Sequence, residues 1–238
     1  MYKMSRASTK SNPEGSGTAD GQERVVTDKR LLKGEATRDR VLDAAERCFA
    51  RDGFDAVSIR QIAADAEVTL GVVGFHCKSK QELFRTVLAR RVEALNVIRR
   101  ERLTELKAAP QGPAVHALVD AYLTPYLEYA SDGDPQWRAY AALIARIVSD
   151  DRYYAEVRDL YDPVALEYLA EFQKLYPHAA KRQLATVLTL TVASLLSIVA
   201  SRERIGGLSG QHEPTRPIDY RDMLIDFCAG GIERALST

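Results

Sequence analysis

Cysteine is scarce in this chain of 238 residues, which contains three. Cys48, Cys77 and Cys228 lie far apart inside helical patterns, at spacings that suit neither a zinc site nor a disulfide framework. They fit a reducing compartment as small core residues, with a redox-sensing Cys77 as the minor alternative. We therefore expect no bound metal ion and no cofactor.

An excess of charge of one sign is also lacking, because 33 Lys and Arg residues balance 33 Asp and Glu residues. A neutral chain cannot bind nucleic acid through its bulk charge. Any such binding has to use a local basic patch and the positive ends of helices.

Long uninterrupted apolar runs are absent too. The first thirty residues are polar and contain no apolar segment of the kind that a signal peptide carries. The most apolar stretch, 184–200, is interrupted by threonines and serines, which is typical of a buried helix rather than of a membrane span. These features predict a cytoplasmic protein without a membrane partner.

The most informative segment that is present covers residues 57–80. Its apolar side chains recur at positions 59, 62, 63 and 66, which predicts a short amphipathic helix that Ser58 caps. Thr69 precedes a second short helix, 70–77, which the polar run 78–80 ends. Two short helices joined by a few residues predict a helix-turn-helix unit.

The second of these helices has two unlike faces. At 100° per residue, Val73 and Cys77 lie on one side, and Phe75 lies on the other. An apolar Phe on an exposed face is better explained by a partner surface than by water. The alternative is that Phe75 belongs to the core.

The segment 37–84 resembles the DNA-binding domain of the TetR/AcrR family of transcriptional regulators. It carries the opening TRDRVLDAA, the helix end FARDG, the second helix SIRQIA and the run KSKQELF after the third helix. The family commonly has Lys-Gly-Thr-Leu-Tyr-x-[His/Tyr]-Phe where this chain has LGVVGFHC. Gly74 therefore stands where the family usually has a Tyr that grips a phosphate, which affects affinity and operator geometry rather than the fold.

The resemblance and the helix phasing together predict the contacts with DNA. Hydroxyl and ammonium groups of Thr37, Ser58 and Lys80 are expected to hold phosphates, with Arg60 as a weaker candidate. The residues expected to face the bases are Thr69, Leu70, Gly71, Val72, Phe75 and His76. Val72 and Phe75 lack hydrogen-bonding groups, so they can sense thymine methyl groups but cannot read guanine.

Before this segment, residues 1–34 form a predicted flexible tail, since they have almost no large apolar side chains to bury. Basic residues outnumber acidic ones among them, so the tail either adds phosphate contacts or has no role. A helix is expected over 35–52, where apolar residues form one stripe and Gly53 follows at a C-cap position. Together with the two short helices it makes a predicted DNA-binding domain over 35–80.

The rest of the chain, 81–238, predicts a larger helical domain. Helices are expected over 80–108, 114–130, 135–148, 151–175, 179–204 and 219–236, with a loop at 205–217. Pro125 should bend the second of these, and Pro163 should bend or split the fourth. The predicted fold class is therefore all-α, with a three-helix DNA-binding domain followed by a larger regulatory and dimerisation domain.

Aromatic residues and arginines collect in the middle of this larger domain. Apolar walls with a few polar tips are typical of small-molecule pockets, although an aromatic stripe is more often core. The residues expected to line a ligand pocket are Tyr122, Tyr126, Trp137, Arg138, Tyr140, Arg146 and Tyr161.

The last two helices are expected to pair with their copies in a second chain as a four-helix bundle, the dimer that the family resemblance also implies. Gly230 and Gly231 lie inside the final helix and suggest close packing there. The alternative is that both helices only close the core of the monomer.

These features predict a homodimeric, ligand-responsive transcriptional regulator, usually a repressor, which binds a near-palindromic DNA operator and is released by an unidentified small-molecule effector. One alternative is a constitutive DNA-binding protein without an effector. An all-helical enzyme is a further alternative, but the regulatory half has no set of residues at metal-site spacing, no nucleophile elbow and no phosphate loop. No catalytic residues are therefore predicted.

Overall fold

The computed structural model describes residues 19–131, 134–148, 150–210 and 215–237, and all the regular elements within them are helices. The chain divides into two compact units, residues 1–40 and residues 41–238. Helix α1 (Ala19–Asp52) provides the described part of the first unit and the opening turns of the second. The helix therefore begins well before residue 35, the start that the sequence predicted, and the flexibility expected for residues 1–18 lies outside the described residues.

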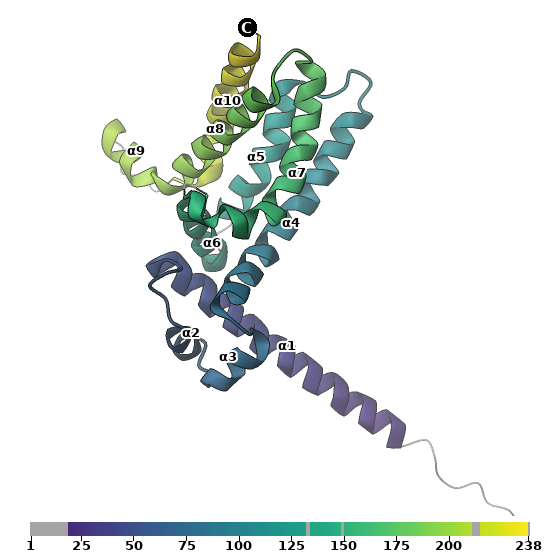
Figure 1. The fold of residues 1–238 in the computed structure, drawn as a ribbon, viewed down its shortest axis with the longest axis vertical. Coiled ribbons are helices and arrows are strands. Elements are labelled where there is room, and N and C mark those ends of the chain that lie inside the picture. The colour runs from purple at the N-terminus through teal and green to yellow at the C-terminus, as the bar shows by residue number, and fades with distance from the viewer. Residues whose placement is uncertain (1–18, 132–133, 149, 211–214, 238) are drawn as a thin grey trace, which may run out of the picture. The chain divides into compact units, whose positions relative to one another are not determined.

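Residues 41–79 form the part of the second unit that we call the head. It contains the end of α1, α2 (Ile59–Asp65) and α3 (Leu70–His76), which are also drawn in Figure 1. Val41, Leu42 and Phe49 from α1, Ile62 from α2 and Val73 from α3 have almost no exposed surface. The apolar spacing that predicted these helices is thus the spacing of the residues that hold the head together, and the helix-turn-helix prediction is confirmed.

The remaining helices form the larger, regulatory part. They are α4 (Lys80–Ala108), α5 (Val115–Ser131), α6 (Pro135–Ile147), α7 (Tyr154–Leu175), α8 (Lys181–Ala200), α9 (Arg202–Ser209) and α10 (Arg221–Leu236), with short 3₁₀ turns η1 (Asp151–Tyr153) and η2 (Pro217–Tyr220). Helix α5 packs against α4, α6, α7, α8 and α10, so it lies at the centre of this part. The all-α fold class is confirmed.

Two helices differ from their predicted course. Helix α7 continues through Pro163 as one element, so of the two predicted alternatives, a bend or a split, the split is absent. The single long helix predicted at 179–204 is instead two helices, α8 and α9, which meet at Ser201. Helix α9 also covers the start of the segment that the sequence predicted to be a loop, and residues 211–214 of that segment lie outside the described residues.

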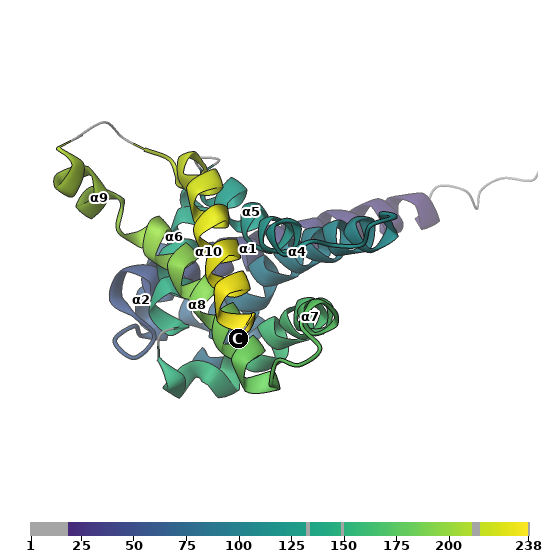
Figure 2. The same ribbon diagram turned by 90° about the horizontal axis from the view of Figure 1, so that it is seen from above.

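Helices α8 and α10 lie side by side, as the views in Figures 1 and 2 agree. By length and composition alone α8 would be long and apolar enough to cross a membrane, and 33% of its apolar stretch is buried within the chain. Its buried side chains include Leu184, Leu188 and Leu195, whereas Leu190 is 61% exposed. One face of α8 is thus packed and another is open.

Candidate nucleic-acid interface

Helix α2 begins at a complete capping box. The hydroxyl of Ser58 accepts a hydrogen bond from the backbone N–H of Gln61 at 3.2 Å, and the Gln61 side chain accepts one from the backbone N–H of Ser58 at 2.8 Å. These bonds satisfy two donors that the first turn would otherwise leave unpaired. Ser58 is therefore a cap, as the sequence predicted, and its exposed side chain is already occupied by Gln61.

The turn between α2 and α3 fixes the angle of the second helix. Glu67 adopts a φ of 53°, a left-handed conformation that side chains other than Gly, Asn and Asp seldom adopt. The next N–H, of Val68, donates to the carbonyl of Ala63 at 3.0 Å and closes the end of α2. This conformation could not be predicted from the sequence, because Glu is not a residue type that signals a positive φ.

Helix α3 buries one residue and opens its other side. Val73 is fully buried, whereas Phe75 is 85% exposed and Leu70 is 49% exposed. Thr69 and Gly71 are exposed, and Val72 and His76 are partly exposed. The residues predicted to face the bases therefore share an accessible surface, and Phe75 does not belong to the core.

Neither glycine of α3 is closely packed. A methyl group added at Gly74 would meet no atom within 4 Å, and one at Gly71 would lie 4.0 Å from the Thr69 hydroxyl. Packing within the chain therefore does not require glycine at position 74. Gly74 therefore adds no side chain to this surface.

Arg60 and Thr37, two residues predicted to contact phosphates, differ in how open their side chains are. Arg60 is exposed on α2. Thr37 lies within α1 rather than at its start, and its hydroxyl donates to the carbonyl of Lys33 at 2.8 Å. No positive helix end is therefore present at Thr37, because the helix continues toward Ala19.

Lys80 is engaged by the chain itself. Its ammonium donates to the carbonyls of Phe54 at 2.8 Å, Val57 at 2.9 Å and Asp55 at 3.3 Å, and lies 4.5 Å from the centre of the Phe54 ring. An ammonium has three N–H donors, and all three are used here. This geometry makes Lys80 a staple for the loop before α2 rather than an open phosphate contact.

The cap of α4 is a feature that the sequence analysis missed. Ser79 accepts from the backbone N–H of Glu82 at 3.0 Å, and the Glu82 carboxylate accepts from the backbone N–H of Lys78 at 2.9 Å. A Ser followed three residues later by Glu is a recognisable capping signal. The run 78–80 therefore starts α4 as well as ending α3.

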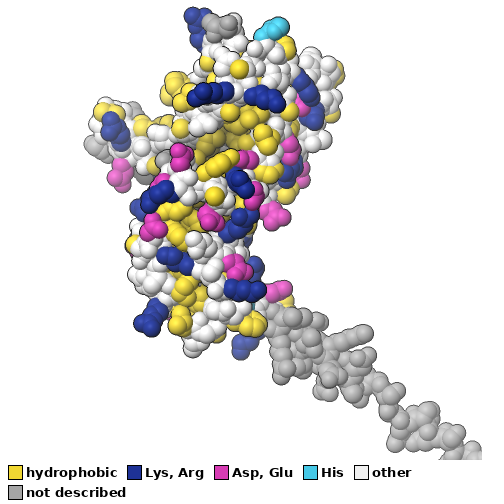
Figure 3. All heavy atoms as spheres, in the orientation of Figure 1, with side chains coloured by type: hydrophobic (Ala, Val, Ile, Leu, Met, Phe, Trp, Pro, Cys, Tyr) yellow, Lys and Arg dark blue, Asp and Glu magenta, His cyan; other side chains and the backbone are white. Residues whose placement is uncertain are grey.

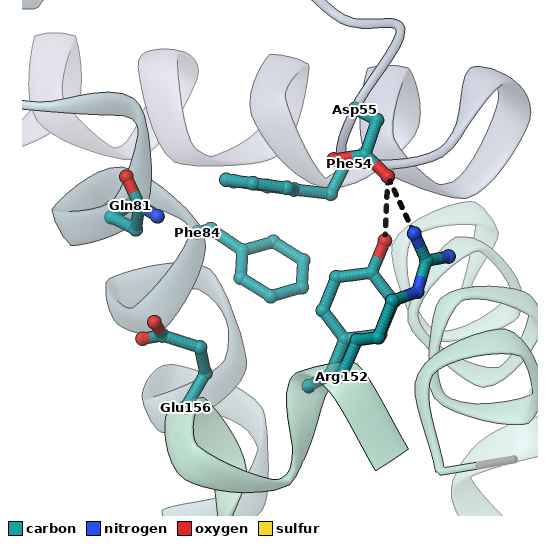
Figure 4. Close-up of a pocket in the computed structure, with 7 residues that line it drawn as sticks. Phe54, Asp55, Gln81, Phe84, Arg152 and Glu156 are labelled. Carbon is teal, nitrogen blue, oxygen red and sulfur yellow. Dashed lines mark hydrogen bonds and ion pairs between the residues drawn. The ribbon is translucent and has the colours of Figure 1, made fainter. Parts of the chain in front are cut away.

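Side chains at the top of the head join it to the regulatory part. Tyr153 of η1 donates to Asp55 at 3.3 Å, Arg152 lies 3.8 Å from the same carboxylate, and Phe54 packs against both Phe84 and Tyr153 (Figure 4). These groups line a small cavity of about 190 Å³.

A second connection runs from α6 to α1. Arg47 donates to the Gln136 side chain at 3.1 Å, and Gln136 donates to the carbonyl of Asp43 at 3.2 Å. Arg146 donates to the carbonyl of Arg51 at 3.3 Å, in the last turn of α1. A movement of α6 would therefore strain or break its hydrogen bonds with α1, the first helix of the head.

Charged groups also lie beneath this connection. Glu46 of α1 is fully buried and accepts from Arg91 at 3.0 Å and from Arg90 at 3.2 Å. Burial raises the pKa of Glu46, while the two arginines oppose that rise.

On the face of the molecule seen in Figure 3, basic and acidic side chains of the head are interspersed rather than gathered into one block.

The aromatic residues predicted to line a pocket pack on one another. Tyr122, Tyr126, Trp137 and Tyr140 are all buried, and the hydroxyls of Tyr140 and Tyr161 lie 2.6 Å apart. Burial raises the pKa of Tyr126 and of Tyr140 well above the usual value. These rings are thus buried and pack on one another, and their part in lining a ligand pocket stays a prediction.

The two arginines of that predicted set lie elsewhere. Arg138 and Arg146 are exposed, and they line a hollow of about 490 Å³ beside α8. Sequence periodicity could not separate the two groups, because core and pocket walls have the same helical spacing. Among the described residues, no group of three or more His, Cys, Asp or Glu side chains is placed to hold a metal ion.

Two family models match the chain in tandem. Residues 41–87 match the model of bacterial regulatory proteins of the tetR family, and residues 120–231 match that of the tetracyclin repressor-like C-terminal domain. The first covers the head and the start of α4, and the second covers most of the regulatory part.

Among curated proteins, the chain is similar to the HTH-type nicotine-responsive transcriptional repressor HdnoR of Paenarthrobacter nicotinovorans. The two are 26% identical over 207 residues, which is 79% of this chain and 92% of that protein. The HTH-type transcriptional regulator SrpR of Pseudomonas putida is 38% identical over 69 residues, 29% of this chain, and the match spans only about a third (32%) of SrpR.

Solved structures share the fold at lower identity. The transcriptional regulator FadR from Bacillus subtilis, in complex with stearoyl-CoA, has a TM-score of 0.60 and 12% identity over 81% of this chain and 97% of that one. A transcriptional regulator from Rhodococcus sp. Rha1 has a TM-score of 0.57 and 20% identity over 84% of this chain and 98% of that one. With its paired motif matches, its helix-turn-helix head and this fold, the chain belongs to the TetR family of DNA-binding transcriptional regulators.

Proposed function

We propose that this regulator is a homodimeric repressor, which acts in the cytoplasm on a near-palindromic operator and releases it when a small organic molecule binds. The observation that carries the proposal is the open face of α3. Phe75 is 85% exposed next to a fully buried Val73, so the helix presents a large apolar ring that the chain itself leaves uncovered. A helix of this kind fits the major groove as a recognition helix.

The chemistry of this face favours apolar readout. Leu70, Val72 and Phe75 carry no donors or acceptors, so contact with thymine methyl groups is the direct readout open to them. Thr69 and His76 supply the polar contacts at either end of the helix. Phosphates are held by Arg60, because the single donors of the Ser58 and Thr37 hydroxyls already bond Gln61 and Lys33, and Lys80 supports the loop from within.

Dimerisation fits the open faces of α8 and α10. Met223 is 76% exposed and Phe227 is 71% exposed, and together with Leu190 they line a shallow, largely apolar groove of about 430 Å³. Apolar side chains of this size in one patch favour a protein partner over water. A second copy that places its own α8 and α10 against this groove would form a four-helix bundle and hold two heads about 34 Å apart.

A response to a small molecule is supported by the relatives. HdnoR is described as nicotine-responsive, and the FadR structure holds stearoyl-CoA. Those ligands have little in common, so they support the presence of an effector without naming it.

Operator selection from random DNA duplexes, followed by mobility-shift titration, tests the reading face. Phe75→Ala should weaken operator binding about tenfold and change the preferred bases, because losing the match at one base pair typically costs roughly 1–3 kcal/mol. The matched control is Leu166→Ala on α7, where the Leu166 side chain is also exposed, at 62%. An unchanged base preference in Phe75→Ala would contradict the assignment of α3.

Sedimentation of the purified protein tests the dimer separately. Phe227→Glu should give monomers and lose operator binding, since it buries an unpaired charge in each half of the proposed bundle. Val97→Glu on α4, where the Val97 side chain is half exposed, should leave both properties unchanged. A monomeric wild-type protein would overturn the dimer.

A further inference from the structure

A hollow lies between α6, α8 and the start of α9, away from the aromatic core. It measures about 490 Å³ and is lined by Ala130, Arg138, Ala141, Ala142, Ala145, Arg146, Val199, Ala200 and Arg202. Helices α6 and α8 pack against each other on this side (Figure 2). Small side chains on both helices leave the space between them unfilled.

The lining divides into an apolar floor and a basic rim. Five alanines and one valine make the floor, and among the described residues that line the hollow the charged ones are three arginines. A volume of this size lies within the range of small-molecule sites, which is about 300–1,000 Å³. It is far larger than an inorganic anion needs.

Two of the three guanidinium groups are only weakly engaged by the chain. Within the described residues, the hydrogen bonds of Arg146 and Arg202 go to backbone carbonyls, those of Arg51, Val199 and Thr215. Asp52, whose charge acts on Arg146, is itself paired with Arg51 at 2.8 Å. Both guanidinium groups therefore keep donors and charge available for a ligand.

We propose that this hollow, which we call the arginine hollow, is the effector site and takes small organic anions with an apolar body, such as carboxylates. The inference rests on the proposed function for the role of the ligand, but not for its binding. Arginine suits this task because its planar fork can hold a carboxylate with two parallel hydrogen bonds. A cation would be repelled by the rim, and a neutral ligand would lack the negative charge that makes these hydrogen bonds charge-assisted on both sides.

Arg146 connects the arginine hollow to the head. Its side chain lines the hollow, and its terminal nitrogen Nη1 donates to the carbonyl of Arg51, two residues before the left-handed Gly53 that follows α1. An anion that draws Arg146 inward competes with this hydrogen bond. Binding therefore favours a state in which α1 and α6 are less firmly joined, and the heads no longer match successive grooves.

Titration calorimetry with the purified dimer tests the binding. Decanoate and 2-naphthoate serve as anionic probes with aliphatic and aromatic bodies, and decyltrimethylammonium serves as the charge-reversed control. Either carboxylate should bind, and the cation should not. Arg146→Gln and Arg202→Gln should each weaken carboxylate binding about tenfold, because each removes a charge-assisted hydrogen bond.

Ala142→Leu provides an independent variant, since it fills the floor without touching the charge and should abolish binding. Arg182→Gln is the matched control, because Arg182 is exposed on α8 and does not line the hollow. Unchanged affinity in Ala142→Leu and in both arginine variants would overturn the site. Failure of both carboxylates to bind would overturn the ligand class.

A mobility shift with the selected operator then tests the effector role. The carboxylate that binds should release the operator from the wild-type protein and from Arg182→Gln, but not from Ala142→Leu. If it binds at the hollow and the operator stays bound, the effector role is wrong while the binding site stands. If another compound releases the operator equally well from Ala142→Leu and from the wild type, the effector site lies elsewhere although the protein is ligand-responsive.

Discussion

Helices α3 and α6 each have one buried, closed face and one exposed, open face. In both helices the closed face stabilises the fold, and the open face is the candidate for binding a partner. Helix α3 closes on Val73 and opens at Phe75, and α6 closes on Tyr140 and opens at Arg138 and Arg146. In α3 the open residue is a large aromatic ring, whereas in α6 the aromatic rings are inside and the open residues are small or charged. The side of the helix, rather than the type of residue, separates core from candidate site.

This difference bears on how aromatic residues in a sequence are interpreted. The ring of Tyr140 packs edge-on against Trp137, with 5.5 Å between the ring centres, and its hydroxyl shares a hydrogen bond with the Tyr161 hydroxyl. Both the ring and the oxygen of Tyr140 are thus already in contact with neighbours inside the chain. Phe75 has one aromatic neighbour, His76, at 5.2 Å, and remains 85% exposed. The first ring stabilises the fold, and the second is available to a partner.

The largest expected effect comes from the closed face of α6. Tyr140→Ala should lower the free energy of unfolding by about 3–5 kcal/mol, because it removes a fully buried ring and leaves a cavity. Chemical denaturation followed by circular dichroism measures this loss. Tyr140→Phe should cost roughly 1 kcal/mol, since only the hydrogen bond with Tyr161 is lost.

The open face of α6 supplies the control. Ala142→Ser should change the free energy of unfolding by less than about 0.5 kcal/mol, because Ala142 is exposed. A small loss in Tyr140→Ala, similar to that of Ala142→Ser, would mean that the aromatic cluster is loosely packed and able to open around a ligand.

Lys80 provides the next test, because the sequence predicted an outward phosphate contact and the structure shows an inward staple. Lys80→Met should lower the free energy of unfolding by about 1.5–3 kcal/mol, since the carbonyls of Phe54, Asp55 and Val57 lose a charged donor. The salt dependence of operator binding should stay the same. Thermal unfolding and mobility shifts at several salt concentrations measure the two effects.

Lys78→Met is the matched control, since Lys78 is exposed on the same short run. A phosphate contact at position 80 would produce the opposite pattern, in which stability is kept and the slope of log K against log salt falls by about one.

The short helices of the head could be predicted because their sequence signals are local. Ser58 and the apolar residues of α2 occupy fixed positions relative to one another, and both the cap and the buried Ile62 lie where that spacing predicts. The burial of Val73 and Cys77 was likewise a matter of helix phase. Propensity and periodicity act over a few residues, so they can be recognised without knowing the fold.

The regulatory part was less predictable because its features depend on contacts between distant segments. The carbonyls that hold Lys80 come from a loop more than twenty residues earlier. The arginine hollow exists because alanines of α6 face Val199 and Ala200 of α8, and a shortage of side-chain volume leaves no pattern in either helix alone. Aromatic spacing indicates burial but does not distinguish a packed core from the wall of a pocket.

The smallest expected effects compare the two caps of the helix-turn-helix. Ser58→Ala should lower the free energy of unfolding by about 1 kcal/mol, because the Ser58 hydroxyl accepts from the backbone N–H of Gln61. Thr69→Ala should change it by less than about 0.5 kcal/mol, since the Thr69 side chain makes no capping hydrogen bond in α3. Chemical denaturation of both variants under the same conditions measures the difference.

Operator binding should show the reverse order. Ser58→Ala loses stability but keeps most of its affinity, because the Ser58 hydroxyl already bonds Gln61. Thr69→Ala keeps stability and loses affinity, because the Thr69 hydroxyl is exposed at the start of α3 and free of any capping bond, where it can donate to a phosphate or a base. If Thr69→Ala bound DNA as tightly as the wild type, the start of α3 would have no role in recognition, and the reading face would be reduced to the region around Phe75.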